Sequence, residues 1–513
     1  MADQLDQLYE QLCEHARETA RWGAIAHLLQ WDERTMMPSA DAENRAEELT
    51  LLSAHIHARK TDPRLGELIE RLEDSPLAAD PLSDTGVTIR RQRRDRDRAM
   101  KLPAGLVEEL SRTSVLGQQC WQQAREDDDF AAFQPVLEKT LRLKREEAEA
   151  LGYEDQPYDA LLDEFEPDAK TTEVAGVLRE LRRELIPLVS ALAASDRRPP
   201  SEILSRHYPR AAQEAFGREV AAAIGFDFQR GRLDVTAHPF CSGVGPNDCR
   251  ITTRYDERAP GSALFGTLHE AGHGIYEQGL RADQWGLPLG QDVSLGIHES
   301  QSRLWENMVG RSRAFWEHFY PRAQGHHFPE SLTGVPLDDF FFAVNEAKPT
   351  LIRVEADEVT YNLHILIRFE LELELLEDRL PVAELPAAWN AKYRDYLGIE
   401  PPNNAQGVLQ DVHWSGGAIG YFPTYSLGNL YAAHWFQAAA DALGDLDEQF
   451  ARGEFTPLRD WLRENIHRQG RRFSATELLQ HVTGESLSSE PLMAHLRSKY
   501  GLLYQLGDLG TGA

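Results

Sequence analysis

The five residues from His269 to His273 have the spacing of a metal-binding helix, with Glu270 between the two histidines. Apolar residues recur at helical spacing around them, which predicts a helix that begins near Pro260. Positions four apart on a helix lie one above the other, so His269 and His273 can bind one ion. A carboxylate at position 270 can reach a water molecule beside that ion. The pattern favours a zinc-dependent hydrolase. The alternative is two ordinary histidines on a half-buried helix, which would give the same sequence pattern.

A second helix is expected over residues 292–307, and it offers a third ligand. One face of this helix is polar and carries Glu299, Ser302, Arg303 and Glu306. Glu299 lies 26 residues beyond His273. A carboxylate on a following helix commonly completes a zinc site of two histidines that keeps its fourth position open. His298 is the rival ligand; if Glu299 binds the ion, His298 is free to contact substrate or to support a ligand.

Just before the first of these helices, the sequence changes to strand-like patterns. Residues 233–240 form one candidate strand, residues 243–247 a turn, and residues 248–255 a second strand. Polar and apolar residues alternate in the second strand, which puts Arg250 on its polar face. We expect a small antiparallel sheet beside the metal-binding helix, with Arg250 available to hold an anion. A solvent-facing strand with routine charges is the alternative.

Two later segments carry further polar groups. A long helix is expected within residues 338–380, restarted at Pro349. Its polar stripe consists of Arg353, Asp357, Tyr361 and His364. The stripe is either a solvated face or a face turned into a water-filled groove. The glycine-rich segment 415–425 cannot be a regular helix. With His413 it brings hydrogen-bond donors that can stabilise an oxyanion, Tyr421 and Tyr425, unless it is a mobile surface loop with aromatic anchors.

These groups need a folded scaffold, and the whole chain predicts a mainly helical one. Residues 1 to about 230 read as successive helices, and the 513 residues can bury a large core. A short loop at 197–200 is the best hinge candidate. The net charge of −29 argues against nucleic acid or an anionic membrane as a partner. With four cysteines, no signal pattern and no run of about 18 apolar residues, a cytoplasmic location is expected.

Six short motifs follow one another along the chain. They are His238-Pro239-Phe240, Asp248-Cys249-Arg250-Ile251-Thr252, His269 to His273, His298-Glu299-Ser300-Gln301, Ile352-Arg353-Val354-Glu355-Ala356-Asp357, and Gly407 to Trp414, which contains Gln410-Asp411 and His413. In these motifs the chain resembles the carboxypeptidase Taq family of metallopeptidases, and the resemblance covers essentially the whole sequence. It implies one nearly all-helical catalytic unit, residues 1–513, in which two lobes flank a deep central groove. A homodimer is also implied.

The resemblance implies a reaction as well. Single amino acids would be released from peptides with a free C-terminus, with broad preference but poor cleavage before a C-terminal proline. Zn²⁺ would be the usual cofactor, and Co²⁺ could replace it. Three residues are expected to hold the metal: His269, His273 and Glu299. Glu270 is expected to act as the general base. The oxyanion would be stabilised by Tyr421, with His413 as the second choice.

A carboxypeptidase must also recognise the α-carboxylate of its substrate. Arg353 is our first choice and Arg250 the second, because the planar guanidinium can bind both carboxylate oxygens. Further substrate contacts are expected from His238, His298, Asp248, Thr252 and Tyr425. A carboxylate or carbonyl should orient each metal-bound imidazole. The candidates for that role are Asp357, Gln410 and Asp411.

Two other functions fit part of the pattern. A metal-dependent oligopeptidase that cuts short peptides internally would use the same metal and base. A helical peptide-binding scaffold with a purely structural ion would use the metal alone. Glu270 speaks against the scaffold, because a structural metal site does not need a base beside its ligand.

Overall fold

The computed structural model describes residues 2–507, which form a mainly helical protein with one small sheet. The elements of the first half are α1 Ala2–Thr35, α2 Ala42–Lys60, α3 Pro63–Glu73, α4 Asp84–Lys101, α5 Ala104–Glu126, α6 Phe130–Leu151, α7 Pro157–Leu162, α8 Thr171–Ala194, α9 Arg210–Ile224, β1 Gly231–Val235, β2 Cys241–Gly245, β3 Asp248–Thr253 and α10 Pro260–Gly279. Those of the second half are α11 Leu295–Arg303, α12 Arg313–Arg322, α13 Leu337–Val344, α14 Tyr361–Leu376, α15 Leu385–Leu397, α16 Pro423–Leu443, α17 Leu446–Ala451, α18 Thr456–Asn465, α19 Ala475–Thr483 and α20 Glu490–Tyr504. The predicted succession of helices before residue 230 is confirmed.

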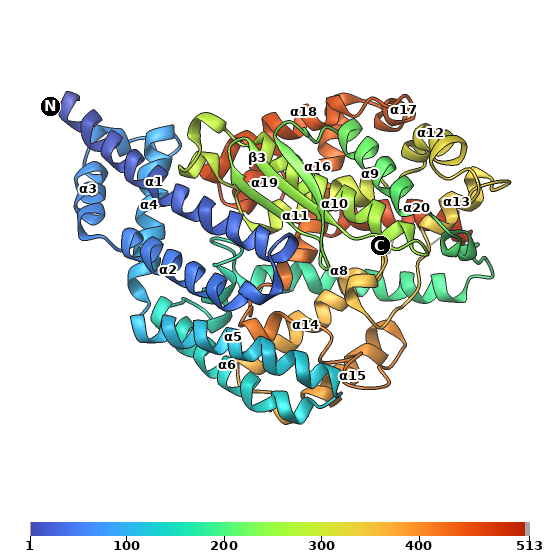
Figure 1. Cartoon of the computed structure of the whole chain (residues 1–513), viewed down its shortest axis with the longest axis horizontal. Coiled ribbons are helices and arrows are strands. Elements are labelled where there is room, and N and C mark those ends of the chain that lie inside the picture. Colours follow the sequence, from blue (N-terminus) through green and yellow to red (C-terminus); the bar gives the residue numbers. More distant parts are fainter. Residues whose placement is uncertain (1, 508–513) are drawn as a thin grey trace.

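Three helices lie at the centre of the molecule. Helix α11 packs against α10 on one side and against α16 on the other (Figure 1). Helices α18, α19 and α20 pack against α16, so the C-terminal part of the chain returns to this centre. One large hydrophobic core surrounds the three helices, whereas α1, α3 and α4 share a small core of their own. The helices that carry the predicted metal ligands therefore lie inside the large hydrophobic core.

The sheet is mixed, which corrects the antiparallel sheet expected from the sequence. Its strand order is β1-β3-β2; β2 and β3 are antiparallel, whereas β1 and β3 are parallel. The segment 243–247, expected to be a turn, lies partly in β2, and only the two residues Pro246 and Asn247 separate β2 from β3. Because the chain reverses twice between β1 and β3, those two strands run in the same direction. Gly243 and Gly245 gave β2 the composition of a turn.

The long helix expected within 338–380 is also corrected. Helix α13 ends at Val344 and α14 begins only at Tyr361, with a short 3₁₀ turn at Arg353–Glu355 between them. The Asp357 carboxylate accepts hydrogen bonds from the backbone N–H groups of Lys348, Val359 and Thr360. This side chain fixes the bend that precedes α14, much as a capping residue does. The four-residue polar stripe therefore does not lie on one helix.

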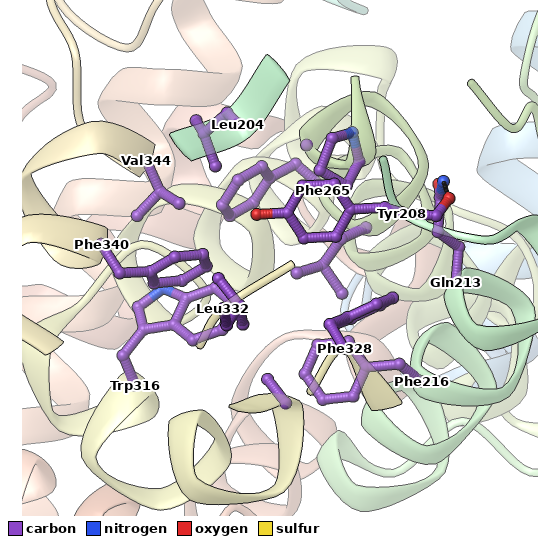
Figure 2. A pocket seen from close by; sticks show the side chains of 14 residues that line it. Leu204, Tyr208, Gln213, Phe216, Phe265, Trp316, Phe328, Leu332, Phe340 and Val344 are labelled. Atoms are coloured by element: carbon purple, nitrogen blue, oxygen red, sulfur yellow. Dashed lines mark hydrogen bonds between the residues drawn. The ribbon is translucent and has the colours of Figure 1, made fainter. Parts of the chain in front are cut away.

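A small apolar cavity lies beside the beginning of α10 (Figure 2). Its lining includes Phe265 on α10, Trp316 on α12 and Phe340 on α13. The labelled side chains in Figure 2 point into this space from several helices, and nearly all of them are apolar. Its polar side chains, Tyr208 and Gln213, donate hydrogen bonds to backbone carbonyl groups, and the lining has no carboxylate, histidine or cysteine, so the cavity is a packing gap and not a second reaction site. Within residues 2–507, no helix is both long and apolar enough to cross a bilayer.

Candidate active site

Two glycines allow the three central helices to approach closely. A Cβ atom at Gly272 on α10 would lie 2.6 Å from the carbonyl oxygen of Gln301 on α11. A Cβ at Gly428 on α16 would lie 2.5 Å from the Cγ atom of Glu299. Neither distance is possible for a real side chain, so only glycine permits this packing. The close approach brings Glu299 towards the two histidines on α10.

The three predicted metal ligands converge. His269, His273 and Glu299 each offer a ligand atom, and these atoms all lie within 4.8 Å of one another. The Glu299 Oε2 atom is 3.5 Å from His269 Nε2 and 3.4 Å from His273 Nε2. Ligand atoms in a tetrahedral zinc site with bonds of about 2.0–2.1 Å are roughly 3.3 Å apart. The donor atoms and their spacing therefore fit a divalent ion such as Zn²⁺.

The Nδ1 atom of each histidine is held from behind. His269 Nδ1 lies 2.9 Å from the Glu306 carboxylate, so it can donate a hydrogen bond and leave Nε2 free for a metal. His273 Nδ1 is 2.5 Å from Nδ1 of His298, whose Nε2 atom is 3.0 Å from Glu277. If Nε2 of His273 binds an ion, its Nδ1–H donates to His298, and His298 in turn donates to Glu277. Such supports fix the tautomer and direction of metal-binding imidazoles.

Arg303 keeps the third ligand ionised. Its Nε atom is 2.7 Å from Glu299 Oε1, and its Nη1 atom is 3.4 Å from Glu306. Burial alone would raise the pKa of Glu299, but Arg303 and His269 outweigh burial and hold this pKa far below its ordinary value. Because Arg303 takes Oε1, the other oxygen of Glu299 faces the two histidines. Burial lowers the pKa of His273 to about 3, so its imidazole is neutral at physiological pH.

Glu270 has the environment of a base poised near neutral pH. It lies on α10 beside His269 and is only 6% exposed. Burial raises the pKa of its carboxyl group to about 7 against the lowering effect of His269. A carboxylate with a pKa near the working pH combines sufficient basicity with a usable ionised fraction. Glu270 is thus suited to move a proton, whereas Glu299, with its depressed pKa, is suited to bind a cation.

The glycine-rich segment supplies an aromatic wall near the ligands. The ring of Tyr421 lies 5.4 Å from that of His413 and 5.3 Å from that of Tyr425. His413 Nε2 is 3.3 Å from the Tyr425 hydroxyl. Burial raises the pKa of Tyr421, and the nearby Glu299 carboxylate adds to this effect, so the phenol keeps its proton. Burial lowers the pKa of His413 to about 3, so this imidazole is a neutral donor.

Arg353 belongs to a buried cluster that has one cation in excess. Its guanidinium lies 2.9 Å from Asp411, and Arg368 holds the other oxygen of the same carboxylate at 2.6 Å. Arg353 also donates to the Tyr361 hydroxyl and lies 5.1 Å from the centre of the Tyr425 ring. Two guanidinium groups share one carboxylate, so the group carries a net charge of about +1. Arg353 is therefore able to attract a further anion next to the aromatic wall.

Arg250 lies apart from the cluster around Arg353, on strand β3 of the sheet. Both oxygens of Asp248 accept hydrogen bonds from it, and its guanidinium lies 4.2 Å from the centre of the Trp31 ring on α1. Thr252, expected on the polar face of β3, is instead buried, and its hydroxyl group exchanges hydrogen bonds with the backbone of Phe240. Asp248 and Thr252 thus orient Arg250 and the adjoining loop. The third motif residue of this region, His238, is exposed in the bend that follows β1.

The predicted supports of the metal ligands were wrong. Asp357 shapes the bend before α14, and Asp411 joins Arg353 to Arg368. Gln410 accepts hydrogen bonds from the backbone N–H of Arg353 and from Arg368. None of the three has a hydrogen bond to His269 or His273 among the described residues. The sequence places them in motifs, but it does not show which side chains they contact.

Glu306 and Glu277 stand in the positions that were predicted for Asp357, Gln410 and Asp411. Glu306 contacts His269, and Glu277 contacts His273 through His298. Glu306 lies on the polar face already recognised beside Glu299, seven residues further along the chain. The helix changes to a π-helical turn at Leu304–Val309, a distortion often found at functional sites. Glu277 follows His273 by four residues and so shares its helical face. This spacing was the available signal for Glu277. The polar face that includes Arg303 gave the signal for Glu306.

Comparisons with known proteins agree with this geometry. The sequence model of the family described as Carboxypeptidase Taq (M32) metallopeptidase matches residues 11–500. Thermostable carboxypeptidase 1 of Thermus thermophilus is 49% identical over 505 residues, which cover 97% of this chain and 99% of that protein. Carboxypeptidase 1 of Bacillus subtilis is 40% identical, with 96% and 97% of the two chains covered.

A solved structure extends the agreement to the fold. The M32 carboxypeptidase from Deinococcus radiodurans R1 superposes with a TM-score of 0.94 at 43% identity. The match covers 97% of this chain and 100% of that one. Sequence, fold and ligand geometry lead to the same assignment: this chain belongs to the carboxypeptidase Taq (M32) family and is a metallocarboxypeptidase.

Proposed function

We propose that this enzyme releases single amino acids from the C-termini of peptides, with Zn²⁺ as its metal and Glu270 as its general base. The observation that carries the proposal is the convergence of His269, His273 and Glu299 beside a buried carboxyl group whose pKa is about 7. A structural ion does not require such a base. A helical scaffold that only binds peptides is therefore the weaker assignment.

The roles of the residues follow from their positions. When bound by His269, His273 and Glu299, the metal would act as a Lewis acid that polarises the scissile carbonyl and makes water more acidic. Glu270 would take a proton from the attacking water and deliver it to the leaving amine. Tyr421 would donate a hydrogen bond to the developing oxyanion, with His413 as a second neutral donor.

Recognition of the substrate carboxylate is assigned to Arg353. The positive excess of the cluster formed by Arg353, Arg368 and Asp411 supplies the charge, and the buried setting strengthens the attraction. Arg250 is paired with both oxygens of Asp248 and has no such excess, so it ranks second. We propose that Arg250, near Trp31, limits how far a peptide extends across the site.

The finer features of the proposal rest on the family resemblance. They are a broad preference for the C-terminal residue, slow release before a C-terminal proline, and activity with Co²⁺ in place of Zn²⁺. A homodimer in the cytoplasm belongs to the same group of proposals.

Paired peptides test the proposal. Each peptide is prepared with a free C-terminus and as its C-terminal amide, and products are followed by mass spectrometry. We expect sequential loss of C-terminal residues from the free acid and little reaction with the amide. Internal cuts at equal rates in both peptides would favour the oligopeptidase. Removal of metal with a chelator should stop the reaction, and Zn²⁺ should restore it.

Replacement of Arg353 by lysine adds a test of carboxylate recognition. Lysine keeps the charge but loses the planar fork that binds two oxygens. We expect KM for free-acid peptides to rise while zinc binding stays unchanged. Arg250→Lys is the matched control and should change KM for short peptides far less.

A further inference from the structure

Two cysteines of the sheet lie side by side next to the metal site. Cys241 on β2 and Cys249 on β3 have their Sγ atoms 3.6 Å apart. The strand register pairs Cys241 with Ile251 and Cys249 with Gly243, so the two cysteines are diagonal neighbours on adjacent strands. Cys249 is buried, whereas Cys241 is partly exposed.

We propose that Cys241 and Cys249 form a site of reversible oxidation, at which a peroxide converts the two thiols into a disulfide. First, the sulfur of Cys241 attacks hydrogen peroxide; an S–O bond forms, the O–O bond breaks, and sulfenic acid and water result. Next, the sulfur of Cys249 attacks that of Cys241; the S–S bond forms, and the oxygen leaves as a second water. Two thiols and one peroxide thus give one disulfide and two waters. A small thiol reverses the change by exchange.

The local backbone allows the sulfurs to approach. A disulfide requires the Sγ atoms to move from 3.6 Å to about 2.05 Å. Strand β2 is short, contains Gly243 and Gly245, and has an irregular register with β3 between these two glycines. Gly243 and Gly245 carry no side chains, so at these two positions only backbone atoms have to move when β2 shifts. The hydrogen bond with Cys249, together with burial, raises the pKa of Cys241, so oxidation should accelerate as pH rises.

A shift of β2 would reach the metal ligands through direct contacts. A Cβ atom at Gly243 would lie 2.5 Å from Glu277 Oε2, so the β2 backbone rests against this carboxylate. The other oxygen of Glu277 is 3.0 Å from His298, and His298 contacts His273. Glu277 and His298 are positioning residues that act through His273. The effect on the metal rests on the proposed function, whereas formation of the disulfide does not.

The experiment uses the full-length protein. Reduced enzyme is treated with hydrogen peroxide, free thiols are alkylated, and peptides are mapped by mass spectrometry. We expect a peptide pair linked through Cys241 and Cys249, which dithiothreitol separates again. Competition with a zinc chelator should show about tenfold weaker zinc binding in the oxidised protein, the loss typical of a disturbed ligand support. The zinc affinity should return after reduction.

Matched variants separate the possible outcomes. Cys241→Ser and Cys249→Ser should each keep full zinc affinity after peroxide, whereas Cys120→Ser on α5 should respond as the wild type does. If peroxide oxidises other residues but forms no link between Cys241 and Cys249, the proposal is wrong. A link that leaves zinc affinity unchanged would refute its coupling to the metal. If the reduced wild-type enzyme binds no zinc, the proposed function fails, while the mass analysis still decides whether the disulfide forms.

Discussion

Replacement of Glu306 by glutamine tests the hydrogen-bonded support of His269, the first of the proposed metal ligands. The glutamate carboxylate lies 2.9 Å from His269 Nδ1, 3.4 Å from Arg303 and 3.7 Å from Arg311. Glutamine has nearly the same volume and can still accept the hydrogen bond from Nδ1–H. The substitution therefore removes mainly the negative charge of Glu306. In the wild type that charge makes the His269 imidazole more basic, and it keeps Arg303 shared between two carboxylates.

Both consequences of the substitution weaken metal binding. The His269 imidazole becomes less basic, and Arg303, with only one carboxylate left, draws Glu299 away from the ion. Loss of a single support of this kind costs about 10- to 100-fold in metal affinity, or roughly 1.4–2.7 kcal/mol. We therefore expect the zinc dissociation constant of the variant to rise by at least about tenfold.

The assay titrates zinc into the metal-free protein in competition with a fluorescent chelator. Glu317→Gln is the matched control, because Glu317 pairs with Arg313 on the exposed side of α12. Thermal unfolding without metal shows whether the variant remains folded. A dissociation constant within about twofold of the wild type, in a folded variant, would falsify the assigned role of Glu306.

Three further predictions concern the base and two glycines. Glu270→Gln should bind zinc normally but lose turnover by about 10²–10⁴-fold. In the wild type, kcat/KM should fall as pH decreases, because the protonated carboxyl cannot accept a proton. The inflection should lie at or below about pH 7, because a bound cation lowers the pKa of Glu270 from about 7. Gly428→Ala should weaken zinc binding and destabilise the fold by about 1–3 kcal/mol, because its Cβ would collide with Glu299; Gly501→Ala, where a Cβ has open space, should do neither. Gly261→Ala, beside the apolar cavity, should raise the free energy of unfolding by about 0.4–1 kcal/mol in urea titrations. Alanine reduces the conformational freedom of the unfolded chain, and its Cβ would make only ordinary contacts in the folded protein.

The proximity of the predicted ligands could be inferred because the spacing of the two histidines is local. Residues four apart on a helix share a face in any fold, so His269 and His273 could be paired from the sequence. The spacing also exposed Glu270 as a neighbour of the ligands and not as one of them. The prediction of Glu299 needed a second helix, and the polar helical face that Glu299 shares with Arg303 and Glu306 supplied it.

The predictions that failed required knowledge of contacts between distant segments. Asp357 was assigned to a helix stripe by its spacing, but its side chain binds three backbone N–H groups and helps to end the helical pattern. Asp411 was assigned to the metal ligands, yet it neutralises Arg353 and Arg368. Strand β2 was mistaken for a turn because strand pairing, and not composition, made Gly243 and Gly245 extended.

Periodicity along the chain was thus enough to predict the helical scaffold and to propose His269, His273 and Glu299 as ligands and Glu270 as the base. Only the folded protein decided which groups stand behind those ligands, since Glu306, His298 and Glu277 act through atoms on neighbouring turns and helices. The physical reason is the range of the forces involved. Side-chain spacing on one helix is fixed by backbone geometry, whereas hydrogen bonds and ion pairs between helices depend on how closely those helices pack. Here that distance is set by Gly272 and Gly428, where a single methyl group would keep the helices apart.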